Sequence, residues 1–310
     1  MKRILVTGGA GFIGSHTVDL LLAEGHQVRV LDNFSTGKRS NLPVAHPHLE
    51  VIAGELASAQ LLREACQSVD AVLHLAAQVS VQKSIEDPVA SCAQNIQNFV
   101  ALLEMARQQE MRVVYASSAA VYGDPQTLPL CEGDAVDPIS PYGLEKYSNE
   151  LYAQLYEKMY GLSHLGLRYF NVYGPRQDPS SPYSGVISRF IDQARSGKPL
   201  TIRGDGLQER DFIHVHDVAR ANVAALRGDM RGVLNIASGT ATTIHQLAES
   251  ICSLIGDGDL AWMSSVPGDI RHSRADVSNM NSCLGVPVQI SLNEGLRSLL
   301  DPVIQAAARV

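Results

Sequence analysis

The sequence predicts an α/β protein in which a doubly wound parallel sheet carries a smaller C-terminal lobe. A short apolar strand at residues 4–6 runs into a glycine-rich turn and then into a stretch with helical periodicity. Strand-like and helix-like segments alternate from there to about residue 174. Such alternation is typical of a parallel sheet that helices cover on both faces. Beyond residue 174 the segments are shorter, which indicates a second lobe built on the first.

Each element of the first lobe follows from its apolar pattern. Short apolar runs predict strands at residues 4–6, 27–31, 50–53, 71–75, 112–116 and 164–169. Longer stretches with apolar residues three and four positions apart predict helices at residues 12–23, 59–66, 88–109 and 142–160. We therefore expect residues 1–174 to form one domain.

The second lobe is expected to span residues 175–310, although segments can cross between the lobes. It begins with a polar, proline-containing loop at 175–182. Helices are predicted at 186–195, 218–226 and 243–254, and strands near 200–202 and 211–215. Ligands of open parallel sheets bind at the carboxyl ends of the strands, and we expect the site there.

The composition argues against several classes of protein. A formal net charge of −7 over 310 residues argues against nucleic-acid binding and against docking on an anionic membrane. No apolar run approaches the ~18 residues of a membrane span. The five cysteines are widely spaced, without a Cys-x-x-Cys pair, which favours a reducing, cytoplasmic compartment. His214 and His216 are two imidazoles without a further ligand, so no metal is expected.

The turn at residues 8–14 (GGAGFIG) lies between the first strand and the first helix, as a dinucleotide-binding fingerprint requires. Its glycines permit a close approach of the backbone to a pyrophosphate at the helix N-terminus, which predicts a Rossmann-type sheet. Asp32 ends the second strand, where a carboxylate accepts hydrogen bonds from a ribose diol and repels a 2′-phosphate. This favours NAD over NADP, but Lys38 and Arg39 leave a phosphate-binding alternative open.

Tyr142 and Lys146 lie four residues apart in a predicted helix, and therefore about one turn apart on one face. An ammonium near a phenol stabilises the phenolate, so we expect a lowered pKa for Tyr142. Such a tyrosine can take a proton from an alcohol and return it to a carbonyl. The spacing alone is common in helices, and it gains meaning from the nucleotide turn that precedes it.

Together with further motifs, these features resemble the extended short-chain dehydrogenase/reductase family. The chain is most similar to nucleotide-sugar 4-epimerases of the UDP-glucose and UDP-N-acetylglucosamine type. The motifs are DAVLHLAA at 70–77, SSAAVYG at 117–123, YGLEK at 142–146, LRYFNVYG at 167–174, GDGLQERDF at 204–212 and PGDIRHS at 267–273. The resemblance implies an NAD-binding first domain and a nucleotide-sugar-binding second lobe.

The resemblance also implies the residues of the site. The catalytic residues would be Ser118, Tyr142 and Lys146. NAD would be contacted by Gly8, Gly11, Phe12, Ile13, Gly14, Asp32, Asn33, Thr36, Gly37, Glu55, Leu56, Ala76, Ala77, Gln78, Asn95, Tyr142, Lys146 and Tyr169. The UDP-sugar would be contacted by Ser80, Ser118, Tyr142, Asn171, Val186, Leu200, Thr201, Ile202, Arg210, Asp269, Arg271 and Ser273. In this set Arg210 and Arg271 would clamp the phosphates, and residues 200–202 would frame the uracil.

Ala119 and Ala120 narrow the expected reaction. Related dehydratases carry an Asp–Glu pair in this loop and related decarboxylases carry a Glu, because those reactions need a further acid or base. Alanine transfers no proton, so what remains is epimerisation at C4 by transient oxidation, rotation of the 4-keto sugar and re-reduction. Ser273 stands where the family gates the space beside the sugar C2 substituent, and a serine leaves room for an acetamido group. We therefore expect UDP-GlcNAc/UDP-GalNAc and UDP-Glc/UDP-Gal as substrates.

Three alternatives stay open. An NAD-dependent nucleotide-sugar oxidoreductase would release NADH, and a UDP-uronate epimerase is disfavoured by Asn171. A non-catalytic NAD-binding sensor would be expected to lose the Ser118, Tyr142 and Lys146 set, which this chain retains.

Val266 stands where many relatives have an arginine, so we expect the phosphate clamp to depend more on Arg271.

The family usually forms a homodimer through the helices that correspond to residues 88–109 and 142–160. We therefore expect a homodimer. The apolar side chains compatible with such an interface, and equally with a helix face buried within the chain, are Ile96, Phe99, Val100, Leu103, Leu151 and Leu155.

Overall fold

Seven parallel strands form the central sheet in the part of the chain that the structure, a computed structural model, describes: residues 2–179, 185–256, 258–265 and 270–307. The strand order is β10-β6-β5-β4-β1-β2-β3. The strands are β1 (Arg3–Thr7), β2 (Gln27–Asp32), β3 (Leu49–Ala53), β4 (Ala71–His74), β5 (Arg112–Ser118), β6 (His164–Tyr169) and β10 (Gly232–Ile236). The chain winds in opposite directions from β1 and from β4, so the ligand crevice of such a sheet lies beside the carboxyl ends of these two strands.

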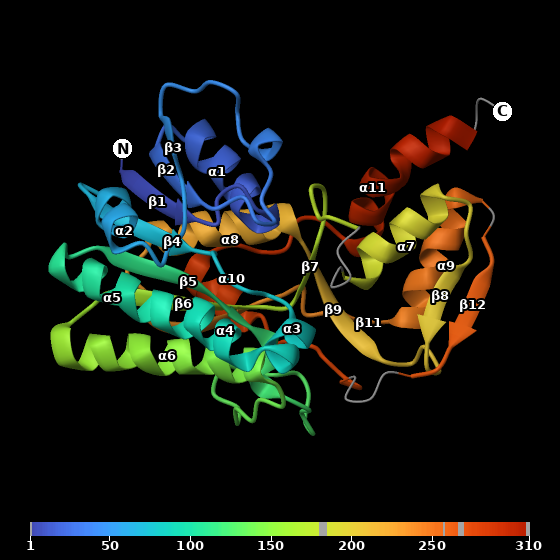
Figure 1. The fold of residues 1–310 in the computed structure, drawn as a ribbon. Coiled ribbons are helices and arrows are strands. Elements are labelled where there is room, and N and C mark those ends of the chain that lie inside the picture. Colours follow the sequence, from blue (N-terminus) through green and yellow to red (C-terminus); the bar gives the residue numbers. More distant parts are fainter. Residues whose placement is uncertain (1, 180–184, 257, 266–269, 308–310) are drawn as a thin grey trace.

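Helices cover both faces of this sheet (Figure 1). One face packs against α1 (Phe12–Ala23), α8 (Val215–Arg227) and α10 (Ser278–Leu284). The other packs against α2 (Ala59–Cys66), α5 (Asn98–Gln108) and α6 (Pro141–Tyr160). Successive strand residues point to opposite faces, so Ile4 and Val6 join the first core and Leu5 joins the second. The six strands predicted for this lobe are confirmed.

The long helix predicted at 88–109 is present but interrupted. It consists of α4 (Pro88–Cys92), a π-helical turn at Ala93–Gln97 and α5. A π-helical turn inserts one extra residue into the helix, and such turns are frequent at functional sites. Here the turn holds the buried Asn95. A short helix that the pattern did not predict, α3 (Val81–Glu86), precedes it.

The second lobe contains two small sheets and three helices among the described residues (Figure 1). One sheet pairs β7 (Asn171–Tyr173), β9 (Glu209–His214) and β11 (Ala241–Thr243), and the other pairs β8 (Leu200–Arg203) with β12 (Leu260–Met263). The helices are α7 (Val186–Arg195), α9 (Ile244–Ile255) and α11 (Leu292–Ala307). Their apolar side chains form a core separate from those of the first lobe.

The chain crosses between the lobes more than once. It enters the second lobe at β7, returns to the first with α8 and β10, and leaves again at β11. Residues beyond 174 thus complete the central sheet, since β10 pairs with β6. Of the predicted loop at 175–182, residues 180–184 lie outside the described part. Among the described residues, no helix is long and apolar enough to cross a membrane.

Candidate active site

The turn between β1 and α1 is tight because its glycines leave space that side chains would fill. Gly8 has a φ of +70°, and a Cβ there would lie 2.8 Å from the backbone nitrogen of Ala76. The helix begins at Phe12, after Gly11, and no side chain caps it. Open N–H groups at a helix N-terminus attract anions. This glycine cradle fits the pyrophosphate of a dinucleotide.

Asp32 ends β2 and faces the glycine turn. Its Oδ2 accepts a hydrogen bond from the N–H of Ala10 at 2.9 Å, and its Oδ1 accepts one from the N–H of Phe34 at 2.8 Å. Each carboxylate oxygen retains a second lone pair, so Asp32 can shape the turn and still bind a ribose diol. Lys38, one of the two residues that left a 2′-phosphate open, forms an ion pair with Asp178 at 3.2 Å, and Arg39 starts the short 3₁₀ helix Arg39–Asn41. The geometry therefore favours NAD.

Most of the other predicted cofactor residues lie in loops that follow the strands at one edge of the sheet. The rest lie on helices next to that edge. Asn33 donates through Nδ2 to Oε1 of Glu55 at 3.0 Å, which joins the loops after β2 and β3. Tyr169 is an exception, because its hydroxyl donates to Oδ1 of Asn222 inside the core. Only its backbone could contact a cofactor. The remaining residues at this edge are Ile13, Gly14, Thr36, Gly37, Leu56, Ala76, Ala77, Gln78 and Asn95.

The predicted proton-transfer residues meet where β5 ends and α6 begins. Ser140 caps α6 by accepting from the N–H of Gly143, which places Tyr142 in the first helical turn. The hydroxyl of Ser118, at the end of β5, lies near the phenol of Tyr142 and lowers its pKa. Lys146 lies with its Nζ 5.7 Å from the centroid of the Tyr142 ring. The structure thus brings the three residues together.

The expectation of a lowered pKa for Tyr142 is wrong in this structure. Burial, with a smaller contribution from the carboxylate of Glu145, raises the pKa of Tyr142 to about 12, and the nearby Ser118 hydroxyl opposes this increase. Lys146 is buried, and this lowers the pKa of its ammonium to about 8. Its Nζ donates to the carbonyl of Ala116 at 3.1 Å. Desolvation therefore affects the pKa of Tyr142 more than the Lys146 ammonium one helical turn away does.

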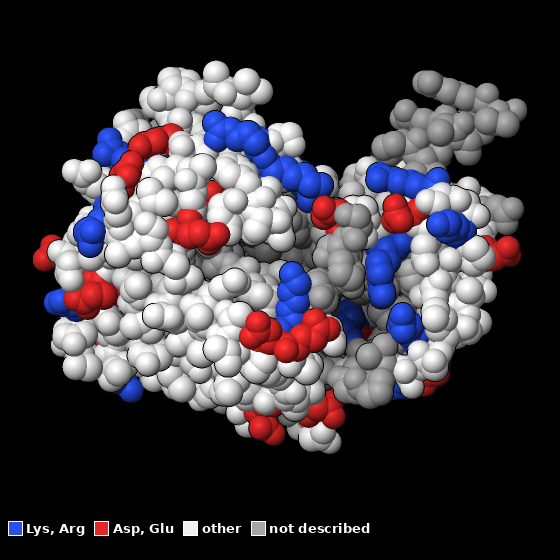
Figure 2. Space-filling view, in the orientation of Figure 1, with Lys and Arg blue, Asp and Glu red and all other residues white. Residues whose placement is uncertain are grey.

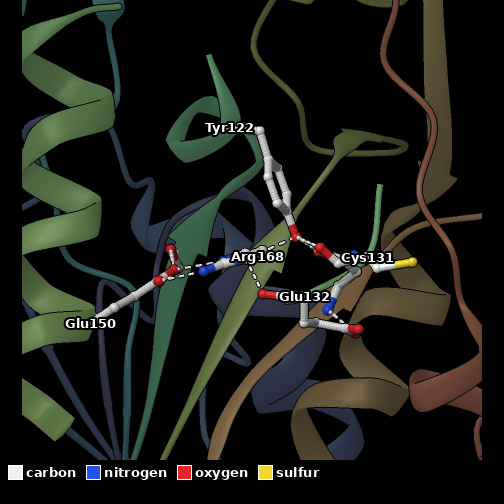
Figure 3. A network of polar contacts seen from close by, with 7 residues as sticks. Tyr122, Cys131, Glu132, Glu150 and Arg168 are labelled. Atoms are coloured by element: carbon white, nitrogen blue, oxygen red, sulfur yellow. Dashed lines mark hydrogen bonds and ion pairs between the residues drawn. The ribbon is translucent and has the colours of Figure 1, made fainter. Parts of the chain in front are cut away.

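A buried polar network joins α6 to the central sheet (Figure 3). Arg168 on β6 donates to both carboxylate oxygens of Glu150 on α6, at 2.9 and 2.7 Å. It also donates to the hydroxyl of Tyr122 at 2.8 Å and to the carbonyl of Glu132 at 3.1 Å. Ser117 donates to Glu150 at 2.5 Å. The network ties α6 to β5, β6 and the loop around residue 131.

The two predicted phosphate ligands lie on neighbouring segments of the second lobe. Arg210 on β9 donates to the carbonyl of Ile270 at 2.7 Å. The next residue, Arg271, forms an exposed ion pair with Asp205 at 2.8 Å. Figure 2 shows a hollow between the two lobes with Lys and Arg side chains on its walls. Asp269, predicted beside them, lies outside the described residues, as does Val266.

The remaining predicted substrate residues differ in accessibility. Leu200 and Ile202 are buried in the core of the second lobe, so only their backbone could frame a base. Thr201 lies between them and accepts through Oγ1 from Gln193 at 2.9 Å. Ser80 caps α3 and is buried. The others stand at element ends or in loops and are partly exposed: Asn171 at the start of β7, Val186 at the start of α7, and Ser273.

Two polar residues beside the site were missed by the sequence reasoning. His74 on β4 is buried, and burial together with the Lys146 charge lowers its pKa to about 3, which keeps the imidazole neutral. Its Nδ1 lies 2.8 Å from Oγ1 of Thr7. Glu145 is buried next to Lys146. The sequence signal that could have revealed Glu145 was the presence of a charged residue inside the YGLEK motif.

The Rossmann-type sheet, the glycine cradle and the Ser–Tyr–Lys cluster define a short-chain dehydrogenase/reductase of the extended type. Residues 4–237 match the model of the NAD dependent epimerase/dehydratase family, and the chain belongs to this family. Its cofactor is accordingly NAD.

Several proteins and solved structures resemble the chain over nearly its whole length. A UDP-glucose 4-epimerase of Mycolicibacterium smegmatis is 37% identical, over 96% of this chain and 97% of the relative. A UDP-N-acetylglucosamine 4-epimerase from Methanobrevibacter ruminantium, in complex with UDP-N-acetylmuramic acid, has a TM-score of 0.94 and 39% identity, covering 98% of this chain and 99% of the other. The UDP-glucose 4-epimerase of Thermus thermophilus in complex with NAD has a TM-score of 0.89 and 35% identity, with the same coverage.

Proposed function

We propose that this chain is an NAD-dependent 4-epimerase of UDP-hexoses. The observation that carries the proposal is the loop after β5. Ser118 lies beside Tyr142, and the residues that follow Ser118 are Ala119 and Ala120. A dehydration would require a second acid or base at these two positions. Interconversion of two epimers requires one reversible proton shuttle, which this arrangement provides.

Three side chains of the protein act at the sugar O4. Tyr142 takes the O4 proton as the C4 hydrogen leaves as hydride, and it returns the proton after the 4-keto sugar has presented its other face. Ser118 holds the same oxygen, and Lys146 contributes positive charge close to the phenol. NAD, when bound, supplies the hydride acceptor and donor and a positive nicotinamide ring that favours the phenolate. The glycine cradle and Asp32 would hold its pyrophosphate and ribose.

The second lobe would anchor the nucleotide while the sugar stays free to turn. Arg210 and Arg271 lie on adjacent segments, because Arg210 bonds the carbonyl of the residue before Arg271. Two guanidinium groups so placed suit a diphosphate. Ser273, two residues further, leaves space for an acetamido group. Its position supports UDP-GlcNAc/UDP-GalNAc as substrates beside UDP-Glc/UDP-Gal, and Asn171 supports these over UDP-uronates.

Separate incubations with UDP-Glc, UDP-GlcNAc and UDP-GlcA, with products identified by NMR, test the proposal. We expect C4 epimers of the first two sugars and no net absorbance of NADH. Accumulating NADH would instead identify a nucleotide-sugar oxidoreductase. Turnover of UDP-GlcA alone would identify a uronate epimerase, and no turnover of any sugar would favour an NAD-binding sensor.

A homodimer through α6 is the proposed assembly. Leu144, Leu151, Leu155 and Met159 on this helix are between 46 and 58% exposed, an apolar stripe at helical spacing. Of the residues expected at the interface, Phe99 and Leu103 are instead fully buried in the chain's own core, because they face α6 and the sheet. Sedimentation of the wild type and of Leu155→Glu tests this surface. We expect a dimer and a monomer respectively, and two equal masses would contradict it.

A further inference from the structure

Glu145 is a buried carboxylate inside the catalytic motif for which the proposed reaction has no use. It lies on α6 between Tyr142 and Lys146 and is 3% exposed. Its Oε2 accepts hydrogen bonds from Oγ of Ser91 at 2.9 Å and from Nδ2 of Asn95 at 2.6 Å. Both donors are neutral. A buried carboxylate is costly unless hydrogen bonds or a nearby cation stabilise it, so its placement next to Lys146 calls for a reason.

Asn95 connects this carboxylate to the wall of the cofactor site. Its Oδ1 accepts from the N–H of Gln78 and its Nδ2 donates to the carbonyl of Gln78, both at 2.8 Å. Asn149, one helical turn beyond Glu145, donates to the carbonyl of Asn95 at 3.0 Å. Gln78 follows β4 at the carboxyl edge of the sheet. The π-helical turn that carries Asn95 is thus fixed between the catalytic helix and this edge.

The polar and charged side chains around Lys146 and Tyr142 lie on three elements. On β4, His74 is neutral at ordinary pH, because burial and Lys146 lower its pKa to about 3. On β5, Ser118 contributes a neutral hydroxyl. On α6, Glu145 is the charged group that raises the pKa of Tyr142 and also that of Lys146. One turn beyond, Glu150 is already paired with Arg168.

We propose that Glu145 is a positioning residue for the proton-transfer pair: it keeps Lys146 cationic in a buried site and ties the catalytic helix, through Asn95, to the loop that lines the cofactor. The inference rests on the proposed function, since it assigns a role within the same reaction. Without this carboxylate, desolvation would act on Lys146 unopposed and the ammonium would lose its proton at lower pH.

The pH dependence of kcat/KM separates this role from simple structural support. This quantity reports the ionisations of the enzyme before substrate binds. Removing a negative charge lowers the pKa of both Tyr142 and Lys146, so both limbs of the profile should move towards acid. A neighbouring charge shifts a pKa by on the order of one unit. A group that only supports the fold would lower the rate at every pH and leave the limbs in place.

The experiment compares the NAD-loaded wild type with Glu145→Gln, which keeps an acceptor oxygen and removes the charge. Glu157→Gln is the matched control, because it makes the same change on the same helix beside His164, away from the site. Glu145→Ser provides a second uncharged variant if the glutamine does not fold. Circular dichroism and NAD content are measured for each protein.

The proposal is supported if both limbs of the kcat/KM profile move to lower pH in a Glu145 variant and stay in place in Glu157→Gln. Unshifted limbs in a folded, NAD-loaded Glu145 variant overturn it, whatever the rate. Failure of both Glu145 variants to fold, while Glu157→Gln folds, also overturns it, since Glu145 would then be structural. A wild type that does not epimerise any UDP-sugar refutes the proposed function instead, and the two failures are thereby distinguished.

Discussion

Arg168 and Glu150 form a bidentate ion pair inside the first lobe. The guanidinium Nε and Nη2 each donate to one carboxylate oxygen, and the two side chains are 4 and 6% exposed. Ser117 donates to the same carboxylate. Because Glu150 lies on α6 and Arg168 on β6, the pair fixes the helix to the sheet at a defined position.

This ion pair belongs to a row of contacts between β5 and α6. Helix positions 142, 146 and 150 lie about one turn apart on one face. Three consecutive residues at the end of β5 face them: Ser118 lies beside Tyr142, the carbonyl of Ala116 accepts from Lys146, and Ser117 donates to Glu150. The geometry of the proton-transfer pair is therefore set by the register of one helix against one strand.

Glu150→Gln is expected to destabilise the protein strongly, because it leaves the Arg168 charge buried without its partner. Breaking a buried pair in this way costs about 3–5 kcal/mol of the free energy of unfolding. The double variant Glu150→Gln/Arg168→Gln leaves no lone charge and should lose less. Urea unfolding of the NAD-loaded proteins measures both. A single variant as stable as the wild type would contradict the assignment.

Tyr142→Phe is expected to lower kcat for UDP-sugar interconversion by at least about 10²-fold, the usual contribution of a positioned acid–base group. The ring remains and only the hydroxyl is lost, so the fold and the NAD content should not change. Product formation followed by NMR and NAD released on denaturation measure the two quantities. A rate close to that of the wild type would show that another group moves the proton.

Ser273→Tyr is expected to exclude acetylated sugars. The larger side chain would fill the space beside the sugar C2 substituent, so kcat/KM for UDP-GlcNAc should fall by at least about 10-fold relative to that for UDP-Glc. Ser273→Ala, which keeps the space open, is the control and should leave the ratio unchanged. An equal loss for both sugars would mean that Ser273 does not face the C2 substituent.

Stability is expected to fall as the pH is lowered from about 6.5 towards 3, partly through His74. Its folded pKa of about 3 lies below the ordinary value of 6.5, so its contribution is complete above 6.5 and is lost as the pH falls towards the folded pKa. His214, with a folded pKa lowered to about 4 by burial, acts in the same direction. Thermal unfolding against pH should be flatter for His74→Asn than for the wild type. The exposed His48→Gln should follow the wild type, and parallel curves for all three would contradict this origin.

Local patterns predicted most of the first lobe. Its strands, such as β1 and β4, are short apolar runs, and the glycine turn and Asp32 occur at expected places. β10 was missed because GVLNI is brief, begins with glycine and follows the second lobe's first elements. Its strand character comes from pairing with β6, a long-range contact that periodicity does not reveal.

The chemistry of the site was only partly predictable. The spacing of Tyr142 and Lys146 gave their proximity, but burial set the direction of the tyrosine pKa. The family resemblance placed Leu200 and Ile202 beside the uracil, while the fold directs their side chains into a core. The hydrogen bond between Glu145 and Asn95 likewise exists because a π-helical turn brings Asn95 to it from another helix. These features depend on tertiary packing that no sequence spacing encodes.

The central claim is that Tyr142 moves a proton while the C4 hydrogen leaves and returns as hydride within one site. The most direct measurement is ¹H NMR of UDP-Glc incubated with the purified protein in D₂O. We predict formation of the C4 epimer with its C4 hydrogen retained and with no accumulation of NADH. Deuterium at C4 would mean exchange with solvent by a different mechanism, and it would contradict the account, as would the absence of any epimer from either UDP-Glc or UDP-GlcNAc.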